Sequence, residues 1–251
     1  MNASGIAAMA AIVSVAGAAS GQVVGTQLYT ITATNNNGTS TMNVVLGASA
    51  GITTVMNGGG DTIGFTWNVF DAFGGDLTFA NGAKLLQNST FGVTSTGNSA
   101  QIDINFTVNA ANGDTTFTVT SGQVVAGTFD NTYEGSAAFS LTDTESFGGL
   151  ATASAGDPAL GGDFFGLLFD GSLIATAITG PFSTTFSVNG NGDFNGAFAP
   201  TVNSASAVYS VTVTEDDIFA GNATAFITGI PTPGTFAVVV AGGLLSARRR
   251  R

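Results

Sequence analysis

"QIDINFTVN", residues 101–109, alternates apolar and polar side chains without interruption. In an extended chain the apolar residues share one face: Ile102, Ile104, Phe106 and Val108. This period of two predicts a strand with one face in a core and the other, including Thr107, in water.

Two further segments repeat this alternation with β-branched residues, "TTFTVT" at 115–120 and "VYSVTVT" at 208–214. A third, "TIGFTWNVF" at 62–70, is rich in aromatic residues. If it is extended, Phe65, Trp67 and Val69 share one face and Phe70 takes the other. A sugar-stacking platform is the alternative for this cluster, but we interpret it as part of a core that many of the 20 phenylalanines also anchor.

Turn signals separate these runs: "NNNG" at 35, "NGGG" at 57, "NG" at 81, "NGD" at 112, "GDP" at 156 and "NGNGD" at 189. Asn-Gly pairs supply the positive φ that tight hairpins need. Short strands at this spacing predict an all-β fold, an antiparallel β-sandwich or jelly-roll-like single domain. Residues 147–163 are expected to be irregular, and no long amphipathic helix is expected between the two ends of the chain.

The predicted organisation has four parts. A secretory signal peptide covers residues 1–21, the β-sandwich domain 22–220 and a C-terminal sorting tail 231–251. Residues 221–230 between them are either a tether or a last strand. Each end of the chain is expected to form a short apolar helix flanking the sandwich.

Composition limits the function classes. The chain of 251 residues has 8% charged residues, and Lys84 is its sole basic residue before the final four arginines, against 16 acidic residues. Because the protein is this acidic, nucleic acid phosphates and anionic lipids repel it. No nucleic acid partner is therefore expected. The chain has no cysteine, and this does not indicate whether the protein is inside or outside the cell.

The chain has no histidine and no cysteine, which excludes Ser-His-Asp triads, thiol nucleophiles and zinc hydrolase sites. A glycosidase carboxylate pair is the alternative, with Glu134, Glu145 and Glu215 as the only glutamates. Most acidic residues lie beside turns, so we predict no catalytic residues and no enzyme.

Calcium is the one cation for which the sequence offers a pattern. "NGDFNG" places Asn191, Asp193 and Asn195 at alternate positions before Gly196, but Val202 stands where a closing acidic ligand belongs. An Asn/Gly turn is the preferred interpretation, as is a solvated turn for "TEDD" at 214–217. No metal or cofactor is therefore predicted.

The first residues match an export signal. "IAAMAAIVSVAGAA" at 6–19 is an uncharged apolar run that ends among small residues, and it is short for a membrane span. A buried alanine-rich helix is the alternative. The preceding "MNASG" lacks a lysine or arginine, which a start upstream of Met1 would explain.

The last residues, "IPTPGTFAVVVAGGLLSARRRR", combine three features: prolines that break a helix, a short apolar run and a basic cluster. Arg248, Arg249, Arg250 and Arg251 would hold the cytoplasmic side of a membrane by the positive-inside rule. The apolar run is at the lower length limit for a span, so insertion is expected to be transient. An ordinary helix whose arginines complement its dipole is the alternative.

In this order of parts, the tail resembles the PEP-CTERM sorting signal, an exosortase substrate. Pro231, Pro233, Gly234 and the four arginines fit the pattern, whereas Thr232 stands where the family usually has Glu. The resemblance covers about 22 residues and implies Sec-type export, an exosortase-like processing enzyme, and a place at the cell surface or in an extracellular matrix.

Two functions follow. The first is a structural or association protein of the cell surface or matrix, sorted through its C-terminal signal. The second is a carbohydrate-binding, lectin-like module for extracellular polysaccharide, with Tyr133 and Tyr209 as candidate exposed aromatics.

Overall fold

The computed structural model describes residues 22–23, 26–60, 62–96, 99–125, 131–145, 149–197, 202 and 204–229. The expected signal peptide and sorting tail both lie outside these residues. Across the described ranges, no helix is long and apolar enough to span a membrane.

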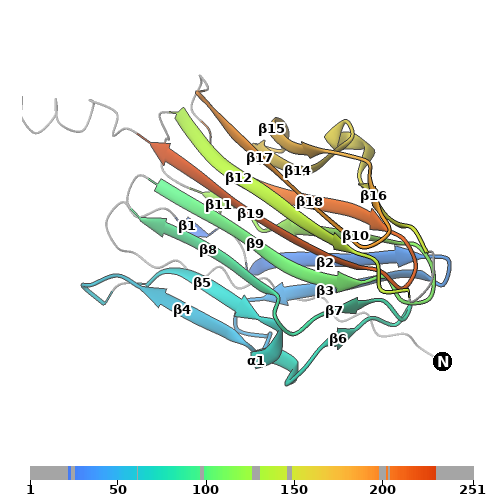
Figure 1. Cartoon of the computed structure of the whole chain (residues 1–251). Helices are drawn as coiled ribbons and strands as arrows, with labels where there is room; N and C mark the ends of the chain where they lie inside the picture. The colour runs from blue at the N-terminus through green and yellow to red at the C-terminus, as the bar shows by residue number, and fades with distance from the viewer. Residues whose placement is uncertain are drawn as a thin grey trace, which may run out of the picture.

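Two antiparallel sheets pack face to face as a sandwich and form a single domain, which confirms the predicted fold class (Figure 1). In the described part of the chain, sheet A contains β1 (Gln22–Val23), β2 (Gln27–Asn35), β3 (Gly38–Val45), β10 (Thr115–Ser121), β11 (Val124–Val125), β13 (Ala151–Ala155), β14 (Asp163–Phe169), β15 (Ser172–Thr179), β16 (Phe182–Thr184) and β18 (Ala205–Val213). Sheet B contains β4 (Ile52–Met56), β5 (Thr62–Asn68), β6 (Leu77–Thr78), β7 (Lys84–Leu85), β8 (Thr90–Thr96), β9 (Ser99–Asn109), β12 (Asn131–Thr142), β17 (Ser187–Ala197) and β19 (Ile218–Gly229).

Sheet B positions the candidate site. Its main order is β17-β12-β19-β9-β8-β5-β4, so β19 and β9 are central and β17 forms an edge. In sheet A, β18 pairs with β10 on one side and with β13 and β14, one after the other, on its opposite side. Helical structure among the described residues is limited to α1 (Val69–Phe73) and a 3-10 turn at Pro158–Leu160.

The core lies between the two sheets, as the alternation of residues 101–109 predicts. Ile102, Ile104, Phe106 and Val108 are each at most 1% exposed on β9. Rings from the two sheets meet there, with the centroids of Phe106 and Tyr209 5.0 Å apart. Aromatic contacts of this kind add to the free energy gained by removing the rings from water.

Two tyrosines of sheet A reach across the core to the backbone of sheet B. The Tyr29 hydroxyl donates to the Gly92 carbonyl at 2.6 Å and also lies 3.0 Å from that of Asp103. The Tyr209 hydroxyl donates to the Ala138 carbonyl at 3.2 Å. Burial raises the pKa of Tyr29 and of Tyr209 well above the usual value, and the charge of Asp103 raises that of Tyr29 further.

The segment at 62–70 is a strand only as far as Asn68. The Asn68 side chain accepts a hydrogen bond from the Asp71 backbone N–H and so caps α1, a helix that the sequence pattern does not predict. Trp67 and Val69 are fully buried, so the interpretation as core is confirmed for them, and Phe70 is 53% exposed.

The prediction for Thr107 was wrong. This residue belongs to the polar face of β9 but is only 9% exposed. The Asn88 side chain donates to its hydroxyl at 2.9 Å, and the Leu86 backbone N–H donates to its carbonyl at 2.8 Å. The loop before β8 therefore covers this end of the polar face.

Residues 147–163, expected to be irregular, contain β13 and the start of β14. β13 pairs with both β16 and β18, and its Ala151 and Ala153 are fully buried. A strand built from Ala, Ser and Thr lacks the large apolar residues that mark alternation in a sequence. Its position in the sheet comes from its neighbours.

The turn predicted around residue 189 is also wrong, because "NGNGD" lies inside β17. Three pairs of opposed residues on β12 and β17 join an aromatic ring with a glycine: Tyr133 with Gly196, Gly135 with Phe194, and Phe139 with Gly190. A Cβ at any of these glycines would overlap the opposite ring. Rings that cover glycines in this way stabilise an edge strand whose inner face carries three glycines beside the buried Phe194.

The sandwich also extends past its predicted end at residue 220. Of the two alternatives for 221–230, tether or last strand, the structure has a strand as far as Gly229. β19 pairs with β12 over Ile218–Gly229 and with β9 over Ile218–Thr228, so it is a central strand of sheet B.

Candidate functional site

The outer face of sheet A is a ladder of threonines. Its exposed and half-buried members on β2, β3 and β10 are Thr30, Thr32, Thr34, Thr39, Thr41, Thr116, Thr118 and Thr120. Their hydroxyls pair across strands, at 3.3 Å between Thr32 and Thr41 and 3.1 Å between Thr34 and Thr39. These four hydroxyls bond to one another, and the ladder contains no aromatic residue.

The outer face of sheet B differs because it presents an aromatic ring. Five residues on adjacent strands stand directly opposite one another across this face, and we call them the Phe226 row: Asn195 on β17, Glu134 on β12, Phe226 on β19, Gln101 on β9 and Thr94 on β8. Phe226 is 41% exposed at the centre of this row.

Phe226 is an aromatic residue at an outward-facing position of β19, where its neighbours are polar. Ala223, Ala225 and Ile227 of β19 face the core, and Phe226 shares the outward parity with Thr224 and Thr228. Polar neighbours therefore surround the ring both along the strand and across it.

On the β9 side of Phe226, hydrogen bonds hold the Gln101 side chain in place. The Gln101 amide donates to the Asp103 carboxylate, at 2.9 Å and 2.7 Å to the two oxygens. The Thr224 hydroxyl donates to the same carboxylate at 2.9 Å. Asp103 thus fixes the side chain that flanks Phe226 on one side.

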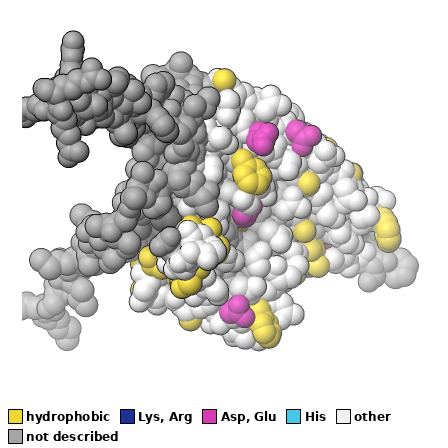
Figure 2. Space-filling model, turned by 90° about the vertical axis from the view of Figure 1, so that its left-hand side faces the viewer, with side chains coloured by type: hydrophobic (Ala, Val, Ile, Leu, Met, Phe, Trp, Pro, Cys, Tyr) yellow, Lys and Arg dark blue, Asp and Glu magenta, His cyan; other side chains and the backbone are white. Residues whose placement is uncertain are grey.

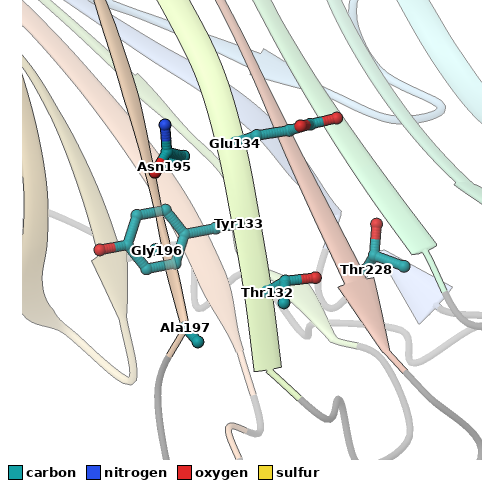
Figure 3. Close-up of a pocket in the computed structure, with 7 residues that line it drawn as sticks. All are labelled: Thr132, Tyr133, Glu134, Asn195, Gly196, Ala197 and Thr228. Atoms are coloured by element: carbon teal, nitrogen blue, oxygen red, sulfur yellow. The ribbon is translucent and has the colours of Figure 1, made fainter.

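Glu134 flanks Phe226 on the other side. Its side chain extends from β12 toward β19, whereas the ring of Tyr133 extends toward Gly196 on β17 (Figure 3). Within the described residues, no hydrogen bond or ion pair is formed by the Glu134 carboxylate. Its oxygens are therefore exposed beside Phe226 to accept hydrogen bonds.

An open pocket adjoins this part of the row. It has a volume of about 360 Å³ and is lined by Thr132, Tyr133, Glu134, Asn195, Gly196, Ala197 and Thr228 (Figure 3). Its side-chain groups are hydroxyls, an amide and a carboxylate, which form hydrogen bonds but supply no positive charge.

The surface around this end of the sandwich is largely uncharged. Figure 2 looks onto the end where β12 begins and β19 finishes, and it shows a few acidic side chains and no basic ones among the described residues. Lys84 on β7 pairs with Asn109, at the opposite end of β9 from Gln101. No cation of the described chain is therefore near the Phe226 row.

The residues expected to carry the sorting signal are not described by the structure. They are Pro231, Thr232, Pro233, Gly234, Arg248, Arg249, Arg250 and Arg251.

The two tyrosines expected to be exposed are not. Tyr209 is fully buried in the core, which corrects that expectation. Tyr133 is half-buried, with its ring 5.7 Å from that of Phe169. The exposed ring on this face belongs instead to Phe226.

The glutamates do not gather at one place. Glu134 lies eight residues, roughly 27 Å of extended strand, from Thr142 at the far end of β12. Glu145 follows that far end, and Glu215 lies in the nearby turn, where the Thr144 hydroxyl bonds to the Asp216 carbonyl. Glu134 therefore cannot pair with either of the other two glutamates.

The calcium pattern is not a loop in the structure. Asn191, Asp193 and Asn195 project from one face of β17, where alternate residues are roughly 7 Å apart along the strand. In the ranges described, no group of three or more acidic residues is arranged to hold a metal ion.

The "TEDD" segment is a turn, as predicted, but one of its residues is buried. Asp217 is 3% exposed and accepts hydrogen bonds from the Thr214 hydroxyl at 2.5 Å and the Thr144 backbone N–H at 3.3 Å. This carboxylate holds the turn between β18 and β19 against the end of β12.

Phe226 and Gln101 are not among the binding residues expected from the sequence. A signal was present, since in "NATAFIT", residues 222–228, the aromatic residue falls on the parity of Asn222 and Thr224. This parity is informative only if the segment is a strand, and a tether is the other interpretation of residues 221–230.

Comparisons with known proteins add little. No family model matches the sequence, and a search of curated proteins finds no relative. Among solved structures, a chain from the structure of infectious bursal disease virus Gt strain is 10% identical, with a TM-score of 0.24. The match covers 85% of this chain and 75% of the viral chain, and at this TM-score it supports no conclusion about either fold or function.

Proposed function

We propose that the protein is an exported, non-enzymatic protein of the cell surface or extracellular matrix that acts by association. A C-terminal signal resembling PEP-CTERM delivers it there through an exosortase-like enzyme. The observation that carries this proposal is the order of proline-containing motif, apolar run and four arginines at residues 231–251.

The position of β19 supports this proposal. The last central strand ends at Gly229, and a single residue separates it from Pro231. The folded body is therefore joined to the sorting tail almost directly. While the tail is held in a membrane, the end of the sandwich shown in Figure 2 lies next to the membrane surface.

The acid–base groups of the chain support a non-enzymatic role. The sequence lacks histidine and cysteine, and Glu134 lies far from Glu145 and Glu215. A retaining or inverting glycosidase needs two carboxyl groups within about 10 Å of each other. Neither Glu145 nor Glu215 lies within this distance of Glu134.

The tail can be tested by changing its two ends separately. With Arg248, Arg249, Arg250 and Arg251 all changed to Ser, the positive-inside contribution is lost, and we expect the tail to slip through uncut. Pro231→Ala combined with Pro233→Ala removes the helix-breaking residues, so we expect membrane retention with the processing site hidden. C-terminal mass and membrane fraction are measured for both variants and the parent. Identical intact tails and equal solubility outside the cell in all three would show that the tail is not a sorting signal.

A further inference from the structure

We propose that the Phe226 row binds an uncharged polysaccharide chain, with a sugar ring stacked on Phe226 and its hydroxyls held by Glu134 and the neighbouring amides. This deepens the proposed function by naming the partner with which the surface protein associates. It rests on the proposed function in one respect, that export brings the protein to the cell surface or matrix where it meets the polysaccharide.

Stacking is the first step. Phe226 is 41% exposed on a face whose other side chains in its row are polar. The C–H groups on one side of a pyranose ring are apolar and slightly positive, and they complement the negative face of an aromatic ring. A ring surrounded by amides, hydroxyls and a carboxylate suits a ligand with an apolar face and a polar rim.

Hydrogen bonding is the second step. The Glu134 carboxylate accepts no hydrogen bond within the described residues and has two oxygens, which suits neighbouring hydroxyls of one sugar. On the opposite side of Phe226, Asp103 and Thr224 hold Gln101 in place. The row thus combines a carboxylate that has no donor among the described residues with an amide whose orientation is fixed before binding.

The course of the row indicates a chain rather than a single sugar. From Gln101 to Asn195 the row crosses three gaps between strands, about 14 Å. It leaves the sheet at the edge strand β17, beside the pocket lined by Thr132, Asn195 and Thr228. A linear polymer can therefore lie along the row and continue past the edge.

Charge favours an uncharged chain. No basic side chain of the described residues lies near the row, and the sequence carries one lysine against 16 acidic residues before its tail. A polyanion is repelled by this surface. A polycation would be attracted to the acidic protein as a whole, without a need for Phe226.

The test uses the purified full chain and a panel of hexasaccharides in titration calorimetry: β-1,4-linked glucose, β-1,3-linked glucose and β-1,4-linked N-acetylglucosamine. Polygalacturonate and a glucosamine hexamer serve as anionic and cationic probes. We expect saturable binding of at least one uncharged hexasaccharide. Phe226→Ala should weaken it about tenfold, because stacking and the burial of the ring are lost.

Glu134→Gln keeps the size of the side chain and should weaken binding by about fivefold to tenfold, because a charged acceptor becomes a neutral one. Phe186→Ala is the matched control, since Phe186 is 80% exposed but lies between β16 and β17, outside the row. Thermal melting of each variant checks that the fold is kept.

Absence of binding to every uncharged hexasaccharide overturns the proposal. So does binding that Phe226→Ala and Glu134→Gln leave unchanged, or binding limited to the glucosamine hexamer and removed by salt. None of these outcomes changes the sorting of the tail variants, so failure of the glycan site is distinguishable from failure of the proposed function.

Discussion

β9 and β17 are strands of 11 residues in the same sheet, yet their sequences have little in common. β9 is central, and its inner face carries Ile102, Ile104, Phe106 and Val108. β17 is an edge strand whose inner face is largely glycine, covered by Phe139 and Tyr133 of β12. A central strand can be specified by its own side chains, whereas this edge strand is specified by its neighbour.

The strongest test of this difference is Ile104→Asp on β9. Ile104 is 1% exposed, and an unpaired carboxylate there should cost several kcal/mol of unfolding free energy, enough to prevent folding at moderate temperature. Ile104→Val, which should cost about 0.5–1.5 kcal/mol, keeps the measurement possible in denaturant titrations.

The control for Ile104 is Asn105→Asp on the exposed face, which should change stability by less than about 1 kcal/mol. Thr107 is unsuitable as this control, since it is buried and hydrogen-bonded to Asn88. Equal losses at positions 104 and 105 would contradict the assigned facing of β9.

Alkaline pH should weaken the contacts that the two buried tyrosines make with sheet B. The Tyr29 hydroxyl bonds to β8 and β9, whereas the Tyr209 hydroxyl bonds to β12, the strand that pairs with β17. The folded-state pKa values of both are raised, so their stabilisation is complete below about pH 10 and is lost as the pH rises above it. At pH 11 each tyrosine should have lost part of this stabilisation, on the order of 1 kcal/mol, measured by denaturant midpoints.

Tyr209→Phe should remove about half of that alkaline loss, at a cost near neutral pH of about 1 kcal/mol for its hydrogen bond. An unchanged dependence on pH in Tyr209→Phe would mean that this hydroxyl ionises as easily in the folded protein as in the unfolded chain.

The last expected effect concerns the glycines of β17. Gly190→Ala places a Cβ against the Phe139 ring and should cost about 1–2 kcal/mol, because the ring must move. Asn189→Ala, on the adjacent exposed position, should stay within about 0.5 kcal/mol of the parent in the same thermal melts. If Gly190→Ala were instead stabilising, backbone entropy would dominate and the ring would have room to move.

Particular residues show how far the sequence predicts the fold and the candidate site. β9, β10 and β18 are predicted because alternating large apolar residues identify a half-buried strand by themselves. β13 and β17 are missed because alanine and glycine give no such pattern, and their places depend on partners distant in sequence. Phe226 is missed as a binding residue because its exposure depends on where β19 lies in the sheet.

The sequence by itself determined the all-β class, the facing of β9 and the shortage of general acid–base groups, since these follow from local periodicity and composition. The tertiary structure alone decided that Tyr209 is internal, that β17 is a strand, and that Glu134, Phe226 and Gln101 stand side by side. The physical reason is that pairing across strands joins residues more than 100 positions apart, and only the register of those strands determines which side chains meet.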